Sequence, residues 1–274
     1  MKKSSKKKLI IYAAVIAVLA VFCIWQNNML TVSEYSYKTD KIEAELDGFK
    51  IVHISDLHNK SFGKNQKRLM EKIKKLSPDI IVITGDIADS NHTDIPKALE
   101  FVEESVKIAK TYYITGNHEY WLDDSEFAEI TESIENLGAV YLSDETVNVA
   151  KNGKSFALTG VDDLSLVNFS DHCPKLDGDT LNVVLAHEPQ FFADYSFHGN
   201  VDLVLSGHAH GGQFILPFIG GVVAPDQGFF PEYTEGMHKM GNTSMIISRG
   251  LGNSVIPVRL FNYPEIVCVT LEKE

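Results

Sequence analysis

The most regular feature of this chain is a set of five short apolar runs, each followed at once by polar residues. The runs cover residues 51–55, 80–84, 112–115, 183–186 and 203–206. Short runs of this kind, rich in Ile, Val and Leu, predict buried strands. The first three are separated by segments with helical start and stop signals, at residues 65–76 and 94–110, and a third such segment, from Asp123 or Asp124 to Leu137, follows them. This alternation of strands and helices predicts parallel strands joined by crossovers.

The second half of the chain is richer in predicted strands than the first. Short strands are expected around Val147, 156–159, Val183, Val204, 245–248, 258–261 and 266–271. Residues 41–46 are expected to form a first edge strand. Two mixed sheets packed face to face, with helices on the outer faces, satisfy both halves. We therefore predict a mixed α/β fold of the α+β kind, a four-layer αββα sandwich.

The N-terminus differs from the rest because a basic tail precedes an uncharged apolar run. Five lysines lie within residues 1–8, and residues 9–25 carry no charge. As a helix this run would span roughly 26 Å, which is at the short limit for crossing a bilayer. We predict a single-pass transmembrane helix at the cell membrane; the alternative is a signal peptide cleaved after Val18-Leu19-Ala20. In both cases the basic flank stays in the cytoplasm and the folded domain lies outside it.

The chain divides into four predicted parts. These are a basic cytoplasmic tail at residues 1–8, the anchor or signal peptide at 9–25, a linker and edge strand at 26–48, and one globular domain at 49–274. Without the five tail lysines, 20 of the 25 basic residues stand against 37 acidic ones, a formal charge of −17. Such a balance argues against nucleic acid as a partner. We expect a monomer.

The polar residues that follow the five runs are of the types that bind divalent cations. They are Asp56, His58, Asp86, Asn117, His187, His208 and His210. Asp56 and His58 are two residues apart, as are His208 and His210. In a regular strand, the two side chains of each pair would therefore point to the same side of the sheet. Ligand sites of open α/β sheets lie at the carboxyl ends of the strands, which predicts one shared pocket. Seven donors exceed the needs of one ion and suit two borderline metals such as Mn, Fe or Zn.

The chemistry predicted for such a pocket is hydrolysis. A central carboxylate, for which Asp86 is the best placed, can bridge two ions about 3.5 to 4 Å apart. Such a pair lowers the pKa of a bridging water and holds the oxygens of a phosphoryl group. The absence of cysteine ligands argues against a purely structural zinc site. We expect a phosphoester to be attacked by a hydroxide that bridges the two metal ions.

A resemblance to the calcineurin-like metallophosphoesterase superfamily is carried by five ordered motifs. They are Asp56-x-His58, Gly85-Asp86, Gly116-Asn117-His118-Glu119, His187 and Gly207-His208-x-His210. The resemblance covers nearly all of residues 50–271 and implies a dinuclear metal-dependent phosphoric ester hydrolase. It implies that one ion is bound by Asp56, His58, Asp86 and His210. It implies that the other is bound by Asp86, Asn117, His187 and His208.

The same resemblance implies roles beside the metals. His118 would lie next to the leaving-group oxygen and donate a proton or a hydrogen bond to it. Asp89 resembles the family carboxylate that pairs with this histidine and holds it charged; a helix-cap or loop role is the alternative. Asn117 is expected to face the substrate as well as a metal ion. Glu119 points elsewhere than its neighbour, and we expect a structural role for it.

Two arginines and one apolar segment complete the candidate residues. Arg249 is a candidate for binding a substrate phosphate, although a structural ion pair is equally compatible with the sequence; Arg259 is expected to be structural. Residues 213–232 are apolar and rich in Gly and Pro. They are expected either to form a hydrophobic wall beside the metals or to reach the membrane. The alternative is a covered loop packed on the second sheet.

Within the superfamily, residues 206–213 and Arg249-Gly250-Leu251-Gly252 resemble bacterial membrane-associated phosphodiesterases of the YkuE and YaeI type. That type includes relatives resembling UDP-2,3-diacylglucosamine pyrophosphohydrolases, which implies a lipid-linked or cell-envelope phosphoester as the substrate. We therefore predict a membrane-tethered extracytoplasmic phosphodiesterase or pyrophosphohydrolase. A non-catalytic metal-containing envelope binding protein is the alternative, and the intact set of seven ligands argues against it.

Overall fold

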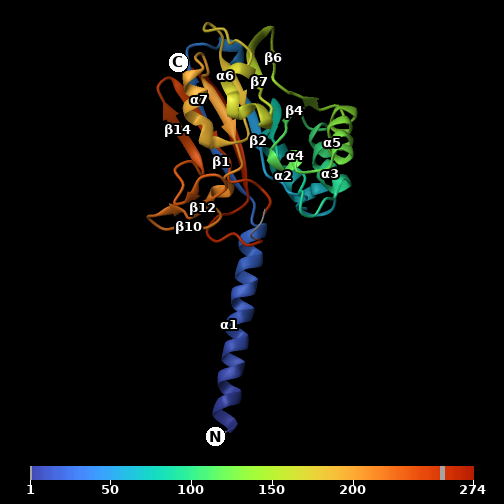
Figure 1. Cartoon of the computed structure of the whole chain (residues 1–274), viewed down its shortest axis with the longest axis vertical. Helices are drawn as coiled ribbons and strands as arrows, with labels where there is room; N and C mark the ends of the chain where they lie inside the picture. The colour runs from blue at the N-terminus through green and yellow to red at the C-terminus, as the bar shows by residue number, and fades with distance from the viewer. Residues whose placement is uncertain (1, 254–256) are drawn as a thin grey trace.

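The computed structural model describes residues 2–253 and 257–274. A folded domain lies at one end of a single long helix, α1 (Lys2–Asn28), which projects away from it (Figure 1). Residues 6–28 of this helix are long and apolar enough to cross a membrane. The last turns contact the domain, since the ring of Phe22 lies 6.1 Å from that of Phe261 and the ring of Trp25 lies 5.6 Å from that of Tyr263.

The first sheet has six strands in the order β1, β16, β2, β3, β4, β5. Their bounds are β1 Thr31–Thr39, β16 Glu265–Lys273, β2 Phe49–Ile54, β3 Ile80–Thr84, β4 Lys110–Ile114 and β5 Val140–Tyr141. The neighbours β2, β3 and β4 are parallel, as the alternation of strands and helices predicts. β16 lies between β1 and β2, parallel to the first and antiparallel to the second. The last strand of the chain thus enters the sheet that the first strands build.

The second sheet also has six strands, in the order β14, β15, β9, β8, β7, β6. Their bounds are β14 Gly236–Met240, β15 Thr243–Ile247, β9 Leu203–Ser206, β8 Asn182–Leu185, β7 Lys154–Gly160 and β6 Glu145–Lys151. The central strands β15, β9, β8 and β7 are parallel. The outer pairs β14–β15 and β6–β7 are antiparallel. Both sheets are therefore mixed.

The strands bury both of their faces, and this produces the four layers. In β3, Val82 packs into a core between the two sheets, while Ile81 and Ile83 pack into a core under the helices on the outer face. In β9, Leu205 joins the core between the sheets and Val204 joins a third core on the other side. The predicted αββα sandwich is confirmed.

The three predicted helices cover the outer face of the first sheet. They are α2 (Lys67–Leu76), α3 (Ile95–Ser105) and α5 (Asp124–Asn136). The side chain of Asp94 caps α3 by accepting a hydrogen bond from Lys97 N, and Gly138 follows α5 with a φ of 96°. α3 ends earlier than predicted because Lys110 must begin β4, where it pairs with Ile80.

Shorter elements connect the layers. They are η1 Ala44–Leu46, η2 Lys64–Gln66, α4 Asn117–Tyr120, η3 Asp163–Asn168, α6 Phe169–His172, η4 Pro189–Phe191, α7 Phe192–Phe197, η5 His210–Gly212, β10 Ile215–Leu216, β11 Gly220–Gly221, β12 Val223–Ala224 and β13 Gly228–Phe229. The helices α6 and α7 pack on the second sheet, where Phe169 and Phe192 belong to the third core. The sequence pattern did not predict either helix, because each is too short to show a period.

The predicted edge strand at residues 41–46 is wrong. The edge strand is β1, which precedes that segment, and residues 44–46 form the 3-10 helix η1. β1 pairs with β16 over its whole length, from Thr31 with Glu265 to Thr39 with Lys273. One face of β1 is half-exposed, so its apolar positions alternate too weakly to give a clear strand signal.

The predicted strand at residues 258–261 is also wrong, since within the described residues only an isolated bridge between Phe214 and Leu260 forms there. Two backbone N–H groups of this segment instead donate hydrogen bonds to side chains at the end of α1. Arg259 N donates to Asn27 Oδ1 at 3.0 Å, and Phe261 N donates to Gln26 Oε1 at 3.1 Å. Because the end of α1 supplies these acceptors, the segment follows the helix and does not join a sheet.

Candidate metal centre

The five polar motifs follow strands that are neighbours in the two sheets. β2, β3 and β4 are parallel neighbours in the first sheet, and β8 and β9 are parallel neighbours in the second. Their carboxyl ends therefore open onto the same region. A hydrogen bond joins the two sheets there, because His208 N donates to Asp56 Oδ1 at 2.9 Å. All seven predicted ligands are buried in this region.

Most of these residues lie in tight turns beyond the strand ends. β2 ends at Ile54 and β9 ends at Ser206, before the ligands begin. Five ligand residues have left-handed backbone, with φ between 45° and 63°: Asp56, His58, Asp86, His208 and His210. Such angles are uncommon outside glycine and are typical of functional sites. The predicted alternation along a regular strand is therefore wrong as a mechanism, although the side chains do converge.

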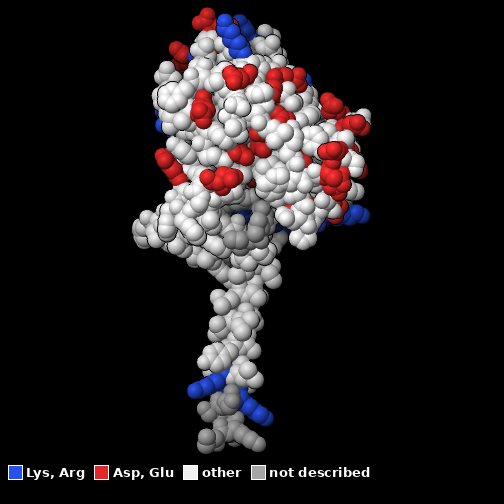
Figure 2. Space-filling model, viewed as in Figure 1, with Lys and Arg blue, Asp and Glu red and all other residues white. Residues whose placement is uncertain are grey.

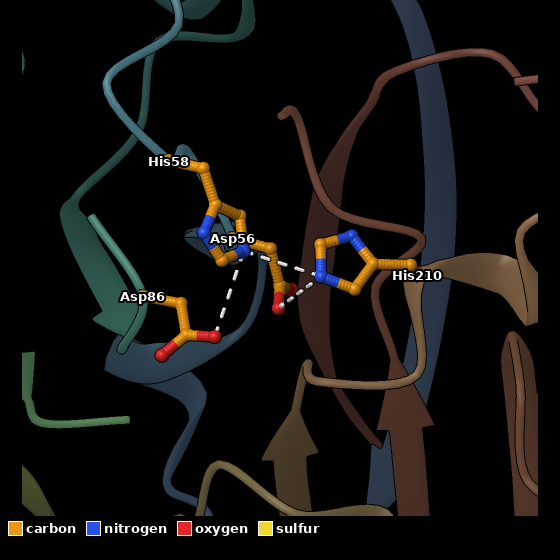
Figure 3. A group of neighbouring side chains, drawn as sticks. All are labelled: Asp56, His58, Asp86 and His210. Carbon is orange, nitrogen blue, oxygen red and sulfur yellow. Dashed lines mark hydrogen bonds and ion pairs between the residues drawn. The ribbon is translucent and has the colours of Figure 1, made fainter. Parts of the chain in front are cut away.

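Four of the predicted ligands form a first donor group. Asp56, His58, Asp86 and His210 each present one ligand atom, all within 4.8 Å of one another (Figure 3). His58 Nε2 lies 3.5 Å from Asp86 Oδ2 and 3.2 Å from His210 Nε2. His210 Nε2 in turn lies 3.6 Å from Asp56 Oδ1. Imidazole nitrogens that face each other between carboxylates fit a bound divalent cation, which would separate their lone pairs.

A second donor group shares one carboxylate with the first. The ligand atoms of Asp86, His187 and His208 also lie within 4.8 Å of one another. His187 Nε2 lies 3.4 Å from Asp86 Oδ2. Asn117 adds its amide oxygen, 3.1 Å from His187 Nε2 and 2.9 Å from His208 Nδ1. Because Asp86 belongs to both groups, the arrangement fits two cations with a carboxylate between them.

Burial and neighbouring charges shift the pKa values of the predicted ligands in different directions. Against burial, the charge of Asp86 raises the pKa of His187 well above its ordinary value, and burial raises the pKa of Asp56. Burial lowers the pKa of His58 to about 3, although the charge of Asp86 opposes this. Burial and the adjacent His58 lower the pKa of His210 well below its ordinary value. Burial alone would raise the pKa of Asp86, but His187 and other nearby histidines lower it well below its ordinary range. Neutral His58 and His210 beside an ionised Asp86 are the forms that divalent cations require.

Two histidines are oriented through the nitrogen that faces away from the site. His187 Nδ1 lies 2.6 Å from the carbonyl oxygen of Thr84, which leaves Nε2 facing Asp86. His208 Nε2 lies 3.1 Å from Asp226 Oδ2, which leaves Nδ1 facing the site. Such partners fix the orientation of a ligand ring. Sequence reasoning missed Asp226, because a single Asp in an apolar segment gives no signal of its own.

Glycines allow the motif loops to pass close to the ligands. A Cβ on Gly116 would lie 2.4 Å from Asp86 Oδ1 and 2.8 Å from the ring of His187. A Cβ on Gly207 would lie 2.5 Å from Asp56 Oδ2. Both positions have room for hydrogen only, so the glycines that precede the ligands in these motifs belong to the packing of the site.

Glu119 supports the loops that carry the ligands and, as predicted, has a structural position. Its Oε2 accepts hydrogen bonds from Asp86 N and Gly116 N, both at 2.8 Å, and its Oε1 accepts one from Ala88 N at 3.1 Å. The side chain is fully buried. Burial raises the pKa of Glu119 to about 7, and the charge of Asp86 adds to this while the three backbone donors oppose it.

Replacing Glu119 with Ala is expected to lower the free energy of unfolding by about 3 kcal/mol or more, because three buried N–H groups lose their acceptor. Chemical denaturation of the full chain in detergent and chelator measures this without a contribution from metal binding. Glu126→Ala is the matched control: Glu126 bonds the backbone of Asp123 at an exposed helix start, at 3.4 Å, and its loss is expected to have little effect. Equal stability of the two variants would contradict the role of Glu119.

His118 lies at the edge of the first donor group. Its ring centre is 4.5 Å from that of His58, and the ring is buried. Nδ1 accepts a hydrogen bond from Ser90 N at 3.2 Å and lies 3.0 Å from Ser90 Oγ, so a neutral ring carries its proton on Nε2. Asp89 Oδ1 lies 3.7 Å from the same Nδ1 and also accepts a hydrogen bond from Asn91 N. Asp89 thus has one contact that fits the predicted pairing with His118 and one that fits the alternative loop role. Ser90 was not predicted from the sequence.

The two arginines are held by other protein groups. Arg249 Nη2 lies 2.9 Å from Glu265 Oε1, and Arg249 Nε lies 3.4 Å from Glu235 Oε2. These contacts correspond to the ion-pair alternative; a phosphate-binding role for Arg249 stays a prediction. Arg259 is fully buried, and its Nη2 lies 3.3 Å from His210 Nδ1. It is structural as predicted, and it also contacts the predicted ligand His210.

A two-sheet sandwich with two donor groups of Asp, His and Asn at its strand ends fits a metal-dependent hydrolase that uses two cations. The chain belongs to the calcineurin-like phosphoesterase family, whose model matches residues 49–212. The predicted superfamily is confirmed, and with it the activity of a metal-dependent phosphoester hydrolase.

Sequence relatives extend over most of the chain. It is 33% identical to the uncharacterized metallophosphoesterase YkuE of Bacillus subtilis, over 90% of this chain and 87% of the relative. It is 30% identical to the uncharacterized metallophosphoesterase Cj0846 of Campylobacter jejuni, over 96% of this chain and 70% of the relative. It is 26% identical to a transmembrane protein with metallophosphoesterase domain of Danio rerio, over 98% of this chain and 64% of the relative.

Proposed function

We propose that the protein is a membrane-tethered phosphoesterase that acts outside the cytoplasm on a phosphodiester or pyrophosphate located at the membrane surface. The observation that carries the reaction class is the pair of donor groups that share Asp86. In the proposed assignment, one cation is bound by Asp56, His58, Asp86 and His210. The other is bound by Asp86, Asn117, His187 and His208.

The two cations would supply Lewis-acid chemistry, lowering the pKa of a water between them and neutralising charge on the phosphoryl oxygens. The protein residues position the reactants around them. Asn117 presents its amide beside the second group, where it can orient the substrate as well as a cation. Ser90 N donates to His118 Nδ1, so the neutral ring can give a departing oxygen a hydrogen bond from Nε2. To transfer a proton, the ring must be charged, with Nδ1 also protonated and facing Asp89 Oδ1 at 3.7 Å. Asp89 can stabilise the charged ring.

The cleft beside the site supports a substrate at the membrane surface. A cavity of about 660 Å³ is lined by His58 and Asp89 of the candidate site. Lys60 and the last two residues of α1, Asn27 and Asn28, also line it. Lys60 Nζ donates to the carbonyl oxygen of Asn27. A substrate in this cleft therefore lies against both the metal centre and the end of the proposed membrane helix, which favours a lipid-linked phosphoester.

Purified full-length protein tests the proposal directly. The metals are removed with a chelator, Mn²⁺, Fe²⁺ or Zn²⁺ is added back, and hydrolysis of aryl phosphodiesters, aryl phosphomonoesters and lipid-linked pyrophosphates is compared. Activity that requires added metal, and that is higher on a membrane-embedded substrate than on a soluble aryl ester, is the expected result. A metal-loaded protein that cleaves none of these compounds would instead favour the non-catalytic binding protein.

The proposed topology gives a separate prediction. The mature chain is expected to retain residues 1–20, because the apolar helix at residues 6–28 is long enough to remain in the bilayer as an anchor. The basic tail is expected in the cytoplasm and the domain outside, because lysines beside an apolar helix stay on the cytoplasmic side. Mass spectrometry of the N-terminal peptide checks retention, and protease added to intact cells should digest the domain and spare the tail. Lysed cells are the control, in which the tail is also cut. An N-terminus at Val21 would show that a signal peptide had been removed.

A further inference from the structure

Two short hairpins beside the metal centre expose large apolar side chains to solvent. β10–β11 and β12–β13 lie in the segment that follows the last ligand motif. Within it, Phe218 is 109% exposed, Phe229 78%, Phe230 66% and Ile219 60%. Several large apolar side chains exposed together on one segment indicate an interaction surface. The predicted alternative of a covered loop is wrong for these residues.

The hairpins lie at the end of the domain from which α1 emerges (Figure 1). Their connection to α1 is direct: Ile215 N donates to the carbonyl oxygen of Leu260, and the next residue, Phe261, contacts the ring of Phe22 on α1. Phe261 is itself 49% exposed. An apolar surface thus continues from the end of α1 onto the hairpins.

Charge is distributed in the way that a lipid surface requires. Residues 214–231 contain a single charged residue, Asp226, and its carboxylate is engaged by His208. In the space-filling view the lobe at the lower left, where the hairpins lie, shows no charged side chains, whereas acidic residues are spread over the rest of the domain (Figure 2). Contact of this lobe with lipid would therefore desolvate few charges, while the acidic remainder stays in water.

The hairpins are held in place before any contact with lipid. Val222 N donates to the carbonyl oxygens of Gly212 and Phe214, and Phe230 N donates to that of Val222. These bonds satisfy backbone groups that would otherwise be costly near a bilayer. The close approach of Gly212 to Gly221 joins the hairpins to the loop after His210, because a Cβ on Gly212 would lie 2.4 Å from Gly221 Cα.

We propose that the two hairpins form a membrane-docking surface that inserts Phe218, Ile219, Phe229 and Phe230 into the interfacial region of the bilayer crossed by α1. This proposal rests on the membrane anchoring proposed above. A surface element with one apolar and one polar face buries its apolar side chains about 5 to 10 Å deep in the headgroup region. Since Asp226 of the same segment contacts His208, docking holds the metal centre next to the membrane surface, at a fixed orientation to lipid-linked substrates.

Spin labels on the full chain in nanodiscs measure the depth of these side chains. Cys23→Ala removes the cysteine on α1, and Cys173 and Cys268 are buried. Single variants Phe218→Cys and Phe229→Cys are labelled with a nitroxide, and collisions with oxygen are compared with collisions with a water-soluble nickel chelate. Phosphatidylcholine is used so that lipid charge plays no part. Val167→Cys is the exposed control, since Val167 is 72% exposed beside α6, which lies at the end of the domain away from α1 (Figure 1).

The expected result is a shift toward oxygen collisions at residues 218 and 229 compared with residue 167. Equal access of the nickel chelate at all three positions would overturn the docking surface. Loss of access to both reagents at 218 and 229 would also overturn it, because it shows cover by protein, from a second copy or another partner. A label at Ile16→Cys on α1 separates the two proposals: if residue 16 is in lipid and 218 and 229 are not, only the docking surface fails, whereas a water-exposed residue 16 refutes the anchoring itself.

Discussion

Replacing Asp86 with Asn is expected to lower hydrolysis about a thousandfold or more and to remove most bound metal. Asp86 is the one side chain common to both donor groups, so an amide in its place weakens the binding of both cations at once. Lewis-acid stabilisation of the transition state is worth several kcal/mol, and each 1.36 kcal/mol is a factor of about ten in rate. Metal analysis of the purified full chain, together with kcat/KM on an aryl phosphodiester, measures both effects.

A control variant shows whether the loss is specific to the metal centre. Asp202 is also a buried carboxylate, but it pairs with Lys41 at 2.7 Å and accepts a hydrogen bond from Asn182 N at 2.8 Å in the second sheet. Asp202→Asn is expected to keep its metal and its turnover, even if its stability falls. Full activity and two bound ions in Asp86→Asn would contradict the shared-carboxylate assignment.

The central strands and the meeting of the polar motifs could be predicted from the sequence because their signals are local. A strand such as β3, buried on both faces, appears as an unbroken apolar run, and its polar end marks the site by position alone. Five such motifs on parallel strands must meet, because the carboxyl ends of parallel neighbours lie together. Caps such as Asp94 and Asp123 gave the helix starts to within a residue.

The features that the sequence did not predict depend on contacts between distant segments. β1 is a strand because β16, more than 200 residues later, pairs with it. Residues 258–261 are not a strand because the end of α1 occupies their backbone donors. Ser90 and Asp226 reach the site histidines from loops whose course only the folded chain fixes. The left-handed turns at the predicted ligands are likewise imposed by the surrounding structure, since Asp and His adopt this conformation more often than most residues but still in a small minority of cases.

Replacing His118 with Ala is expected to lower turnover while both cations stay bound. General acid catalysis contributes about 10² to 10⁴ in rate, so a loss of that size is expected for an ester whose leaving group is an alkyl alcohol. The loss should be smaller for a nitrophenyl ester, because nitrophenolate is a weak base and leaves without a proton. Turnover of the two esters by wild type and variant, with metal analysis of each protein, gives the comparison.

His172 provides the control histidine, and the two variants separate proton donation from the other roles open to His118. His172 Nδ1 lies 3.3 Å from Asp144 Oδ2, so it also faces a carboxylate, but its side chain is 48% exposed and it is not among the described residues that line the cleft beside the metal centre. His172→Ala is therefore expected to leave both turnover numbers unchanged. His118 also forms a donor group with His58 and Asp89, so a variant that loses metal along with turnover would place His118 among the ligands. Equal losses on the alkyl and nitrophenyl esters, with metal retained, would show that His118 positions the substrate and does not protonate the leaving group.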